Sequence, residues 1–298
     1  MPKNQNPQTS KLSALILLSS LILGVFPMLQ ANELELRVMS FNVRNSNGRD
    51  GENRWQNRKE FTCETLQKHA ADVVGLQEAT QVQIDTFLKE APQYQYLGTG
   101  AKGGNKGQFT AIMFRKDRFA VGESGSFWLS NTPNMPSKHW GNHHLRNCTW
   151  AKLTDKSSNQ SFYVYNTHLD DGSQVSREKS VECISKHIHQ HAKGAPFILM
   201  GDFNIPEDNP AITYLTQGSK LSHTSPISVV DSFRALHSQT QGLGTYHGFE
   251  GKTEGHRIDY IFLSHGSRTT AAAIDRSHKN GRYPSDHFPV TAHIFLKR

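Results

Sequence analysis

The chain has 298 residues, with 33 Lys and Arg against 26 Asp and Glu and a formal net charge of +7. Hydrophobic residues make up 36% and charged residues 20% of it, which is typical of a globular protein. These fractions exclude a collagen, a coiled coil, a disordered tail and a multi-span membrane protein. The length allows one or two domains, and no internal repeat suggests a solenoid.

The first 31 residues are predicted to be a secretory signal peptide. Lys3 and Lys11 precede an apolar run from Leu12 to Phe26, and the small residue Ala31 follows. The run is shorter than the ~20 residues that a membrane-spanning helix needs. An uncleaved anchor is the alternative, but a charged start, a short apolar middle and a small final residue favour export. We therefore expect a secreted or periplasmic protein with no membrane span after cleavage.

Removing residues 1–31 removes two lysines and no acid, so the net charge falls from +7 to +5. A mild positive excess is compatible with an anionic substrate but does not identify one. The three cysteines, Cys63, Cys148 and Cys183, have no CxxC spacing, and no disulfide framework is predicted. No linker-like composition interrupts the rest of the chain, so we expect a single domain over residues 32–298.

Hydrophobic periodicity predicts strands and helices interspersed along the chain. In chain order these are a strand at 34–43, a helix at 58–70, a strand at 73–77, a helix around 84–91, strands at 110–114, 149–153 and 162–166, a helix at 176–191, a strand at 196–200, a helix at 210–217, and strands at 257–263 and 289–295. The glycine-rich segment 98–107 lacks a P-loop ending and is predicted to be a mobile loop beside a site. Periodicity alone favours a doubly wound parallel sheet.

Five short segments place polar residues where an apolar strand ends, and a sixth places an acid inside an apolar strand. They are residues 40–44 (SFNVR), 77–78 (QE), 166–170 (NTHLD), 201–204 (GDFN), 285–289 (SDHFP) and 257–261 (RIDYI). Burying an unpaired carboxylate costs several kcal/mol, so each acid needs a metal, a cation or a histidine as partner. Any one segment could be a helix cap or a turn, but six in one domain favour a common site.

The residue types in these segments indicate the chemistry. The candidate metal ligands offer oxygen atoms only; they are Asn42, Glu78, Asp202, Asn204 and Asp286. Such a set suits Mg²⁺, Mn²⁺ or Ca²⁺ rather than zinc, and Mg²⁺ favours phosphate oxygens as further ligands. Two nearby histidines, His168 and His287, add a base and a proton donor near neutral pH.

With these motifs in this order, the chain resembles the endonuclease/exonuclease/phosphatase superfamily, which includes DNase I, exonuclease III, neutral sphingomyelinases and inositol polyphosphate 5-phosphatases. The resemblance runs from about residue 36 to residue 294, and GDFN and SDHFPV are its most specific pieces. Residues 127–130 and 146–151 resemble a branch of exported bacterial members. The resemblance implies a DNase I-like four-layer α/β sandwich, with two mixed, mostly antiparallel sheets flanked by helices. It replaces the doubly wound expectation.

The resemblance also implies roles for the metal ligands. Glu78 is the principal ligand, Asn42 lies beside it, and Asp286 completes the site from the far end of the chain. Asp202 and Asn204 hold a second ion or orient the attacking water and the phosphate. One or two Mg²⁺ or Mn²⁺ ions are therefore expected.

For catalysis, the resemblance implies that His287 is the general base and that Asp259 fixes its tautomer. His168 donates to a non-bridging phosphate oxygen, and Arg146 lies near the scissile phosphate.

Other aromatic and histidine residues are expected to contact substrate. His139, His143 and His144 could form a zinc cluster, but lining a substrate loop together with Trp128 and Trp140 is favoured. A further weak substrate contact is assigned to His247.

These features predict an exported metal-dependent phosphodiesterase with no obligate protein partner. Its phosphate-ester substrate is a nucleic acid, a lipid head group or a sugar phosphodiester. The alternatives are a DNA or RNA nuclease, a sphingomyelinase-like enzyme, a sugar-phosphate phosphatase, and a ligand-binding protein that has lost turnover. A zinc-dependent hydrolase is not favoured because no HExxH motif is present.

Overall fold

Two six-stranded sheets lie face to face in the computed structural model, which describes residues 1–2 and 33–297. The predicted signal peptide lies outside these residues, apart from its first two. One sheet has the strand order β11(Arg268–Ile274), β12(Val290–Lys297), β1(Glu33–Asn42), β2(Val73–Ala79), β4(Phe109–Arg115), β3(Tyr94–Leu97). The other has the order β5(Phe119–Trp128), β6(Asn147–Asp155), β7(Ser161–His168), β8(Phe197–Asp202), β10(Asp259–Ser264), β9(Val229–Asp231).

Both sheets are mixed and mostly antiparallel. The parallel pairs are β1 with β2 and β7 with β8, and all other neighbours run antiparallel. The two parallel pairs are each joined through a helix, α1(Trp55–His69) and α3(Gln174–Ala192) respectively. The doubly wound expectation is therefore wrong, because local periodicity reveals these two βαβ units but not the hairpins and late strands that pair around them.

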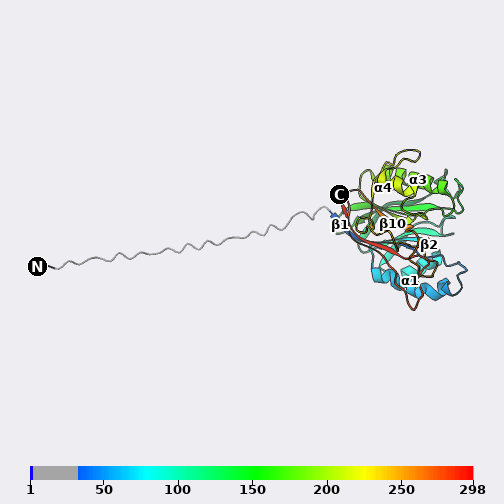
Figure 1. The fold of residues 1–298 in the computed structure, drawn as a ribbon, viewed down its shortest axis with the longest axis horizontal. Coiled ribbons are helices and arrows are strands. Elements are labelled where there is room, and N and C mark those ends of the chain that lie inside the picture. The colour runs from blue at the N-terminus through cyan, green and yellow to red at the C-terminus, as the bar shows by residue number, and fades with distance from the viewer. Residues whose placement is uncertain (3–32, 298) are drawn as a thin grey trace. The chain divides into compact units, whose positions relative to one another are not determined.

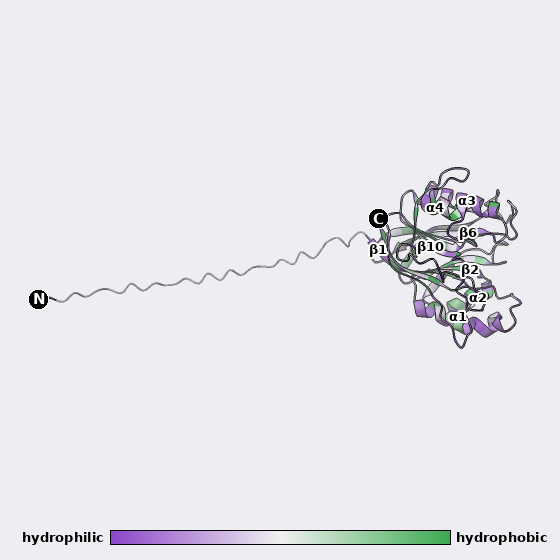
Figure 2. Ribbon diagram, in the orientation of Figure 1, coloured by the Kyte–Doolittle hydropathy of each residue, from purple (hydrophilic) through white to green (hydrophobic). Residues whose placement is uncertain are grey.

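Helices cover the outer face of each sheet and complete four layers. On one side lie α1 and α2(Gln81–Glu90), and on the other lie α3 and α4(Pro210–Gln217), as Figures 1 and 2 show. Three apolar clusters fill the spaces between the layers, and the central one joins the two sheets through residues such as Val38, Val164 and Ile198. The predicted DNase I-like sandwich is confirmed.

The local sequence explains where the helices begin. Thr80 and Gln83 form a capping box at the start of α2, the Ser173 hydroxyl accepts the Ser176 N–H at the start of α3, and Pro210 occupies the first turn of α4 after Asn209. A short 3-10 helix, Gly51–Asn53, precedes α1.

Four strands were not predicted from the sequence: β3, β5, β9 and β11. The last of them reads RTTAAAI and is largely exposed at the sheet edge, so it lacks the apolar alternation that marks a half-buried strand. The strand expected from Arg257 starts at Asp259 instead.

Residues Glu33–Arg298 form one compact unit, and the three cysteines are free thiols. Within the described part of the chain, no helix combines the length and apolar character needed to cross a membrane.

Candidate active site

A cavity of ≈ 430 Å³ opens at the end of the sandwich where the polar motifs lie. The parallel pairs β1–β2 and β7–β8, one from each sheet, bring their carboxyl ends to this end of the sandwich, and the antiparallel strands β10 and β12 begin there. Its lining consists of Arg44, Asn45, Glu78, Gln108, His144, Arg146, His168, Asp171, Asp202, Asn204, Tyr246, Ile258, Asp286 and His287.

Strand register places three of the motif residues side by side. Asp202 at the end of β8 pairs with His168 on β7 and with Asp259 on β10. Residues paired across neighbouring strands present their side chains to the same face of the sheet. The alignment of these strands therefore gathers one histidine and two carboxylates at one point.

His287 is held by Asp259 beneath the cavity. Its Nδ1 lies 2.9 Å from the Asp259 Oδ2, both residues are buried, and its Nε2 lies 3.7 Å from Asp202 Oδ2. With Nδ1–H donated to Asp259, the neutral ring has Nε2 available as a proton acceptor. Burial alone would lower the pKa of His287, but the Asp259 and Asp202 carboxylates raise it above its usual range.

The side chain of Asn42 bridges a carboxylate from each sheet. Its amide N–H group donates to Asp202 Oδ2 at 2.9 Å and to Glu78 Oε1 at 3.3 Å. Burial, reinforced by Asp259, raises the pKa of Asp202 to about 7. Full ionisation of Asp202 at this point therefore calls for added positive charge.

A bulge at the end of β2 directs Glu78 toward the cavity. The β2–β4 register shifts between Leu76 and Ala79, and Glu78 has a left-handed backbone with φ 61°. Bulges of this kind re-aim side chains beside active sites. Burial opposes ionisation of Glu78, but hydrogen bonds from Asn45 and the nearby charge of His287 hold its pKa below the usual value.

Arg44 lies beside the carboxylates but is engaged elsewhere. It binds Asp50 through Nε at 3.1 Å and Nη2 at 2.8 Å, whereas it approaches Asp286 only to 3.7 Å and Glu78 only to 3.9 Å. Burial raises the pKa of Asp286. Several incompletely neutralised oxygen donors in one buried place fit a hard divalent cation, so the donor set is compatible with Mg²⁺ or Mn²⁺.

The cavity also contains donors suited to a phosphate. His168 lies with Nε2 3.5 Å from Asp202 Oδ2, and burial together with Arg146 lowers its pKa well below the usual value. Arg146 is buried and places Nη2 3.3 Å from Asp171 Oδ1. Asn204 has φ 56° and donates its backbone N–H to Asp202.

Three residues predicted to contact substrate do not line this cavity. The Trp128 indole is buried and donates to the Ala101 carbonyl at 2.7 Å, so it supports the glycine-rich loop from below. Trp140 donates to Asn131 and packs against the core between α3 and its sheet. His247 is buried and stacks on Phe288 with ring centroids 3.9 Å apart.

Sequence reasoning missed Tyr246, the neighbour of His247. Successive side chains of an extended segment point to opposite sides, so when His247 is turned inward Tyr246 is turned outward. Tyr246 is 54% exposed, and its ring lies 5.2 Å from that of His287. Gln108, Asn45 and Asp171 also line the cavity, and only the proximity of the last two to quoted motifs could have indicated them.

The glycine-rich segment, predicted to be a mobile loop, is closed by hydrogen bonds. Ala101 N–H donates to Gln108 O at 2.8 Å, and Lys102 N–H donates to Lys106 O at 3.0 Å. It lies beside the site, as expected.

Comparison with known proteins gives consistent matches. The chain matches the Endonuclease/Exonuclease/phosphatase family over residues 39–287. A Bacteroides vulgatus structure of an endonuclease/exonuclease/phosphatase shares 28% identity at a TM-score of 0.82, covering 89% of this chain and 100% of that one. The mannosyl-6-phosphatase structure from Bacteroides thetaiotaomicron shares 30% identity at a TM-score of 0.78, covering 87% of this chain and 99% of that one.

Curated relatives are matched over part of their length. Tyrosyl-DNA phosphodiesterase 2 of Danio rerio is 27% identical over 278 residues, which cover 88% of this chain and 67% of that protein. An uncharacterized protein of Acanthamoeba polyphaga mimivirus, L388, is 25% identical over 162 residues, which cover 51% of this chain and 59% of that protein.

Proposed function

Because the chain belongs to the Endonuclease/Exonuclease/phosphatase family, whose enzymes hydrolyse phosphoric esters, we propose that it is an exported phosphodiesterase dependent on Mg²⁺ or Mn²⁺. The observation that carries this proposal is the His287–Asp259 pair, 2.9 Å apart, beside a group of carboxylates in one cavity. The pair supplies a base, and the carboxylates supply cation ligands.

His287 accepts the proton of the attacking water at Nε2. Asp259 accepts the Nδ1–H, which fixes the ring orientation and stabilises the imidazolium that forms. The water then attacks phosphorus in line with the leaving oxygen. Because Asp259 already orients His287, the base needs no rearrangement during the reaction.

His168 and Arg146 stabilise the negative charge that builds on the phosphate oxygens. The lowered pKa of His168 keeps this imidazole neutral at pH 7, so it retains an N–H to donate, and Arg146 contributes a permanent positive charge nearby. Glu78, Asn42 and Asp286 would hold one divalent cation, and Asp202 and Asn204 would hold a second or orient the water and phosphate. A bound cation of this kind supplies Lewis-acid stabilisation of the phosphoryl oxygens.

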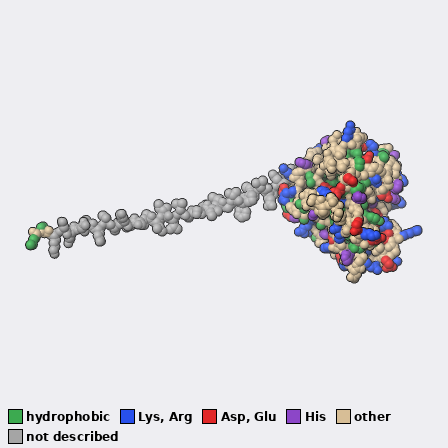
Figure 3. Space-filling view, viewed as in Figure 1, with side chains coloured by type: hydrophobic (Ala, Val, Ile, Leu, Met, Phe, Trp, Pro, Cys, Tyr) green, Lys and Arg blue, Asp and Glu red, His purple; other side chains and the backbone are tan. Residues whose placement is uncertain are grey.

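The comparisons with known proteins favour some substrate classes but do not select a single one. The similar proteins include a mannosyl-6-phosphatase and a tyrosyl-DNA phosphodiesterase, so sugar phosphates and nucleic acids both remain candidates. The face drawn in Figure 3 mixes basic and acidic side chains. Export rests on the charged start and the apolar run of the N-terminal segment.

A substrate panel tests the proposal. The purified protein is assayed on bis-p-nitrophenyl phosphate, p-nitrophenyl phosphate, mannose 6-phosphate, DNA, RNA and sphingomyelin, with EDTA and with Mg²⁺, Mn²⁺ or Zn²⁺ restored. We expect phosphodiester hydrolysis that EDTA abolishes and Mg²⁺ or Mn²⁺ restores. His287→Ala should lower kcat by about 100-fold or more, as is typical for loss of one catalytic group.

The matched control is His293→Ala, because His293 lies on β12 and contacts Glu35 outside the cavity. Hydrolysis that is insensitive to both EDTA and His287→Ala would refute the proposal. Localisation is tested separately by fractionating cells that produce the full chain.

A further inference from the structure

A second cavity adjoins the catalytic one. Its volume is ≈ 580 Å³, and it shares Asn45, Gln108 and His144 with the lining of the catalytic cavity. The glycine-rich loop contributes Lys102, and the segment before β6 contributes Lys138. We call this second cavity the cationic cleft; its remaining lining residues are Asn47, Thr80, Ala101, Gly107, His143 and Leu145.

The charge of the cationic cleft is opposite to that of the catalytic cavity. Carboxylates line the catalytic cavity, whereas the residues lining the cleft include no acid. Among the described residues, no carboxylate forms an ion pair with Lys102 or Lys138, and the Lys138 ammonium donates only to the His143 carbonyl at 3.1 Å. Two ammonium groups without carboxylate partners beside one cavity favour an anion.

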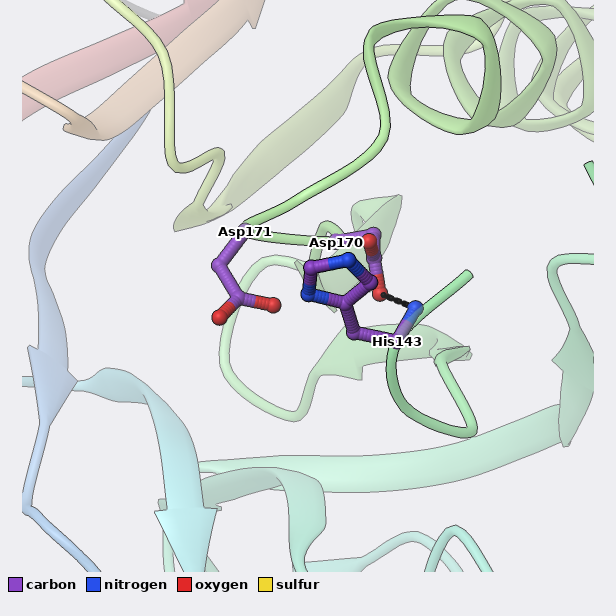
Figure 4. A group of neighbouring side chains, drawn as sticks. All are labelled: His143, Asp170 and Asp171. Carbon is purple, nitrogen blue, oxygen red and sulfur yellow. Dashed lines mark hydrogen bonds between the residues drawn. The ribbon is translucent and has the colours of Figure 1, made fainter. Parts of the chain in front are cut away.

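The walls of the cleft are fixed before any ligand binds. The Trp128 indole and the internal hydrogen bonds described above hold the glycine-rich loop. On the other side, Asp170 Oδ2 accepts the backbone N–H of His143 at 2.9 Å and of His144 at 3.1 Å. Figure 4 shows the first of these bonds.

Asp170 is a loop anchor rather than a metal ligand. Its other oxygen, Oδ1, accepts the backbone N–H groups of Gly172 and Ser173 at 3.1 and 3.0 Å. His143, Asp170 and Asp171 lie close enough together to suggest a metal site, but four backbone donors already occupy the Asp170 carboxylate. The anchoring fixes the backbone that carries His143 and His144 along the cleft, and such preorganisation lowers the cost of binding.

We propose that the cationic cleft binds a second phosphate of the substrate, one cavity away from the phosphate that is cleaved. The preferred substrates are then phosphoesters that carry two phosphate groups. The inference rests on the proposed function, because it assigns the catalytic cavity to the scissile phosphate. A nucleic-acid strand and a sugar bisphosphate share this chemistry, and the test separates them.

The test compares substrates with one and two phosphates in Lys102→Gln, Lys138→Gln and the double variant. One pair is mannose 6-phosphate and mannose 1,6-bisphosphate, and the other is a thymidine dinucleotide without and with a 5′-phosphate. We expect the wild type to prefer the two-phosphate member of at least one pair. The double variant should lower that kcat/KM ratio by about 10-fold, mainly through KM, because it removes charge-assisted contacts. Lys186→Gln, an exposed lysine on α3, is the matched control.

The responding pair identifies the source of the second phosphate. An unchanged ratio in the double variant, or no preference in either pair, would overturn the inference. To separate this outcome from failure of the proposed function, binding of both two-phosphate compounds is measured by calorimetry in His287→Ala. If nothing is hydrolysed, the proposed function fails. Binding that weakens when Lys102→Gln and Lys138→Gln are added to His287→Ala still supports phosphate binding by the cleft. Equal binding with and without them refutes it.

Discussion

His287 can accept a proton only when its ring is neutral, and Asp259 opposes this by stabilising the imidazolium. Because Asp259 raises the pKa of His287, kcat/KM should rise with pH as the ring loses its proton. Asp259→Asn should move the acidic limb of kcat/KM to lower pH, because it removes the charge that raises the pKa. It should also lower the plateau by about 100-fold or more, because the ring is no longer held in the correct tautomer.

Profiles of kcat/KM from pH 5 to pH 10 test both effects. Asp117→Asn serves as the control, since Asp117 is an exposed acid paired with Arg115. An acidic limb at the same pH in Asp259→Asn and in the wild type would contradict the assignment.

Tyr246 is the exposed aromatic residue among those that line the catalytic cavity, and we expect it to stack on the leaving group. Its ring meets that of His287 in an edge-on arrangement with centroids 5.2 Å apart. Tyr246→Ala should raise KM for aryl and nucleoside esters by about 5-fold, within the range measured for aromatic stacking, and change kcat less. Tyr246→Phe should retain most of the affinity. A KM that is equal in all three proteins would exclude stacking on Tyr246.

At the residue scale, the sequence predicted the chemical type of the site residues better than the direction in which their side chains point. The metal-ligand and histidine motifs converge because each ends or begins a strand at the same end of the sandwich. Trp128 and His247 were predicted as substrate contacts from their residue types, but strand and loop geometry turned both inward. A one-residue change in register reverses the face that a side chain occupies, and that information is tertiary.

At the element scale, Asp155 stabilises the hairpin between β6 and β7. It accepts the N–H groups of Ser157 and Ser158 and binds Arg118 Nε at 2.9 Å. Burial opposes its ionisation, but these hydrogen bonds hold the pKa of Asp155 well below its usual value. We expect Asp155→Asn to lower the free energy of unfolding by about 2 kcal/mol at pH 7, as is typical when bonds to a buried charged group are lost.

The pH dependence of this effect has a definite sign. A carboxyl whose folded-state pKa is depressed stabilises the fold above its unfolded pKa, and that stability is lost as the pH falls through the folded value. The difference between wild type and Asp155→Asn should therefore shrink below about pH 4. Urea unfolding at pH 7, 4 and 3 measures it, with Asp117→Asn as the exposed control. A constant difference across this range would show that the charge of Asp155 is not responsible.

Periodicity predicted most helices and buried strands but not how the strands are shared between two sheets. The units β1–α1–β2 and β7–α3–β8 are local and therefore visible in the sequence. The pairing of β12 with β1 joins residues more than 250 positions apart, for example Glu33 with Lys297. Local hydrophobic patterns contain no information about such a pair, so only the resemblance of the ordered motifs predicted the sandwich.

At the scale of the whole molecule, the sandwich gathers acids that would repel one another if no cation were bound. Asp202 shows this most clearly, because burial and Asp259 raise its pKa to about 7. An acid with a raised folded-state pKa destabilises the fold at every pH above its unfolded value. Asp202→Asn should therefore raise the melting temperature in EDTA at pH 8, while removing part of the cation site.

The same site should make the stability of the wild type depend on divalent cations. A cation at 100 times its Kd adds about 2.7 kcal/mol to the free energy of unfolding, which corresponds to a rise of about 5–10 °C in the melting temperature for a chain of this size. Mg²⁺ and Mn²⁺ should produce this rise in the wild type and a smaller rise in Asp202→Asn and Glu78→Gln. The control is Glu123→Gln, at an exposed position of β5, which should show the same rise as the wild type. Calorimetric scans in EDTA and in each cation measure the shift without any substrate. A wild-type melting temperature that no divalent cation changes would show that the convergent carboxylates do not form a cation site, whatever the protein hydrolyses.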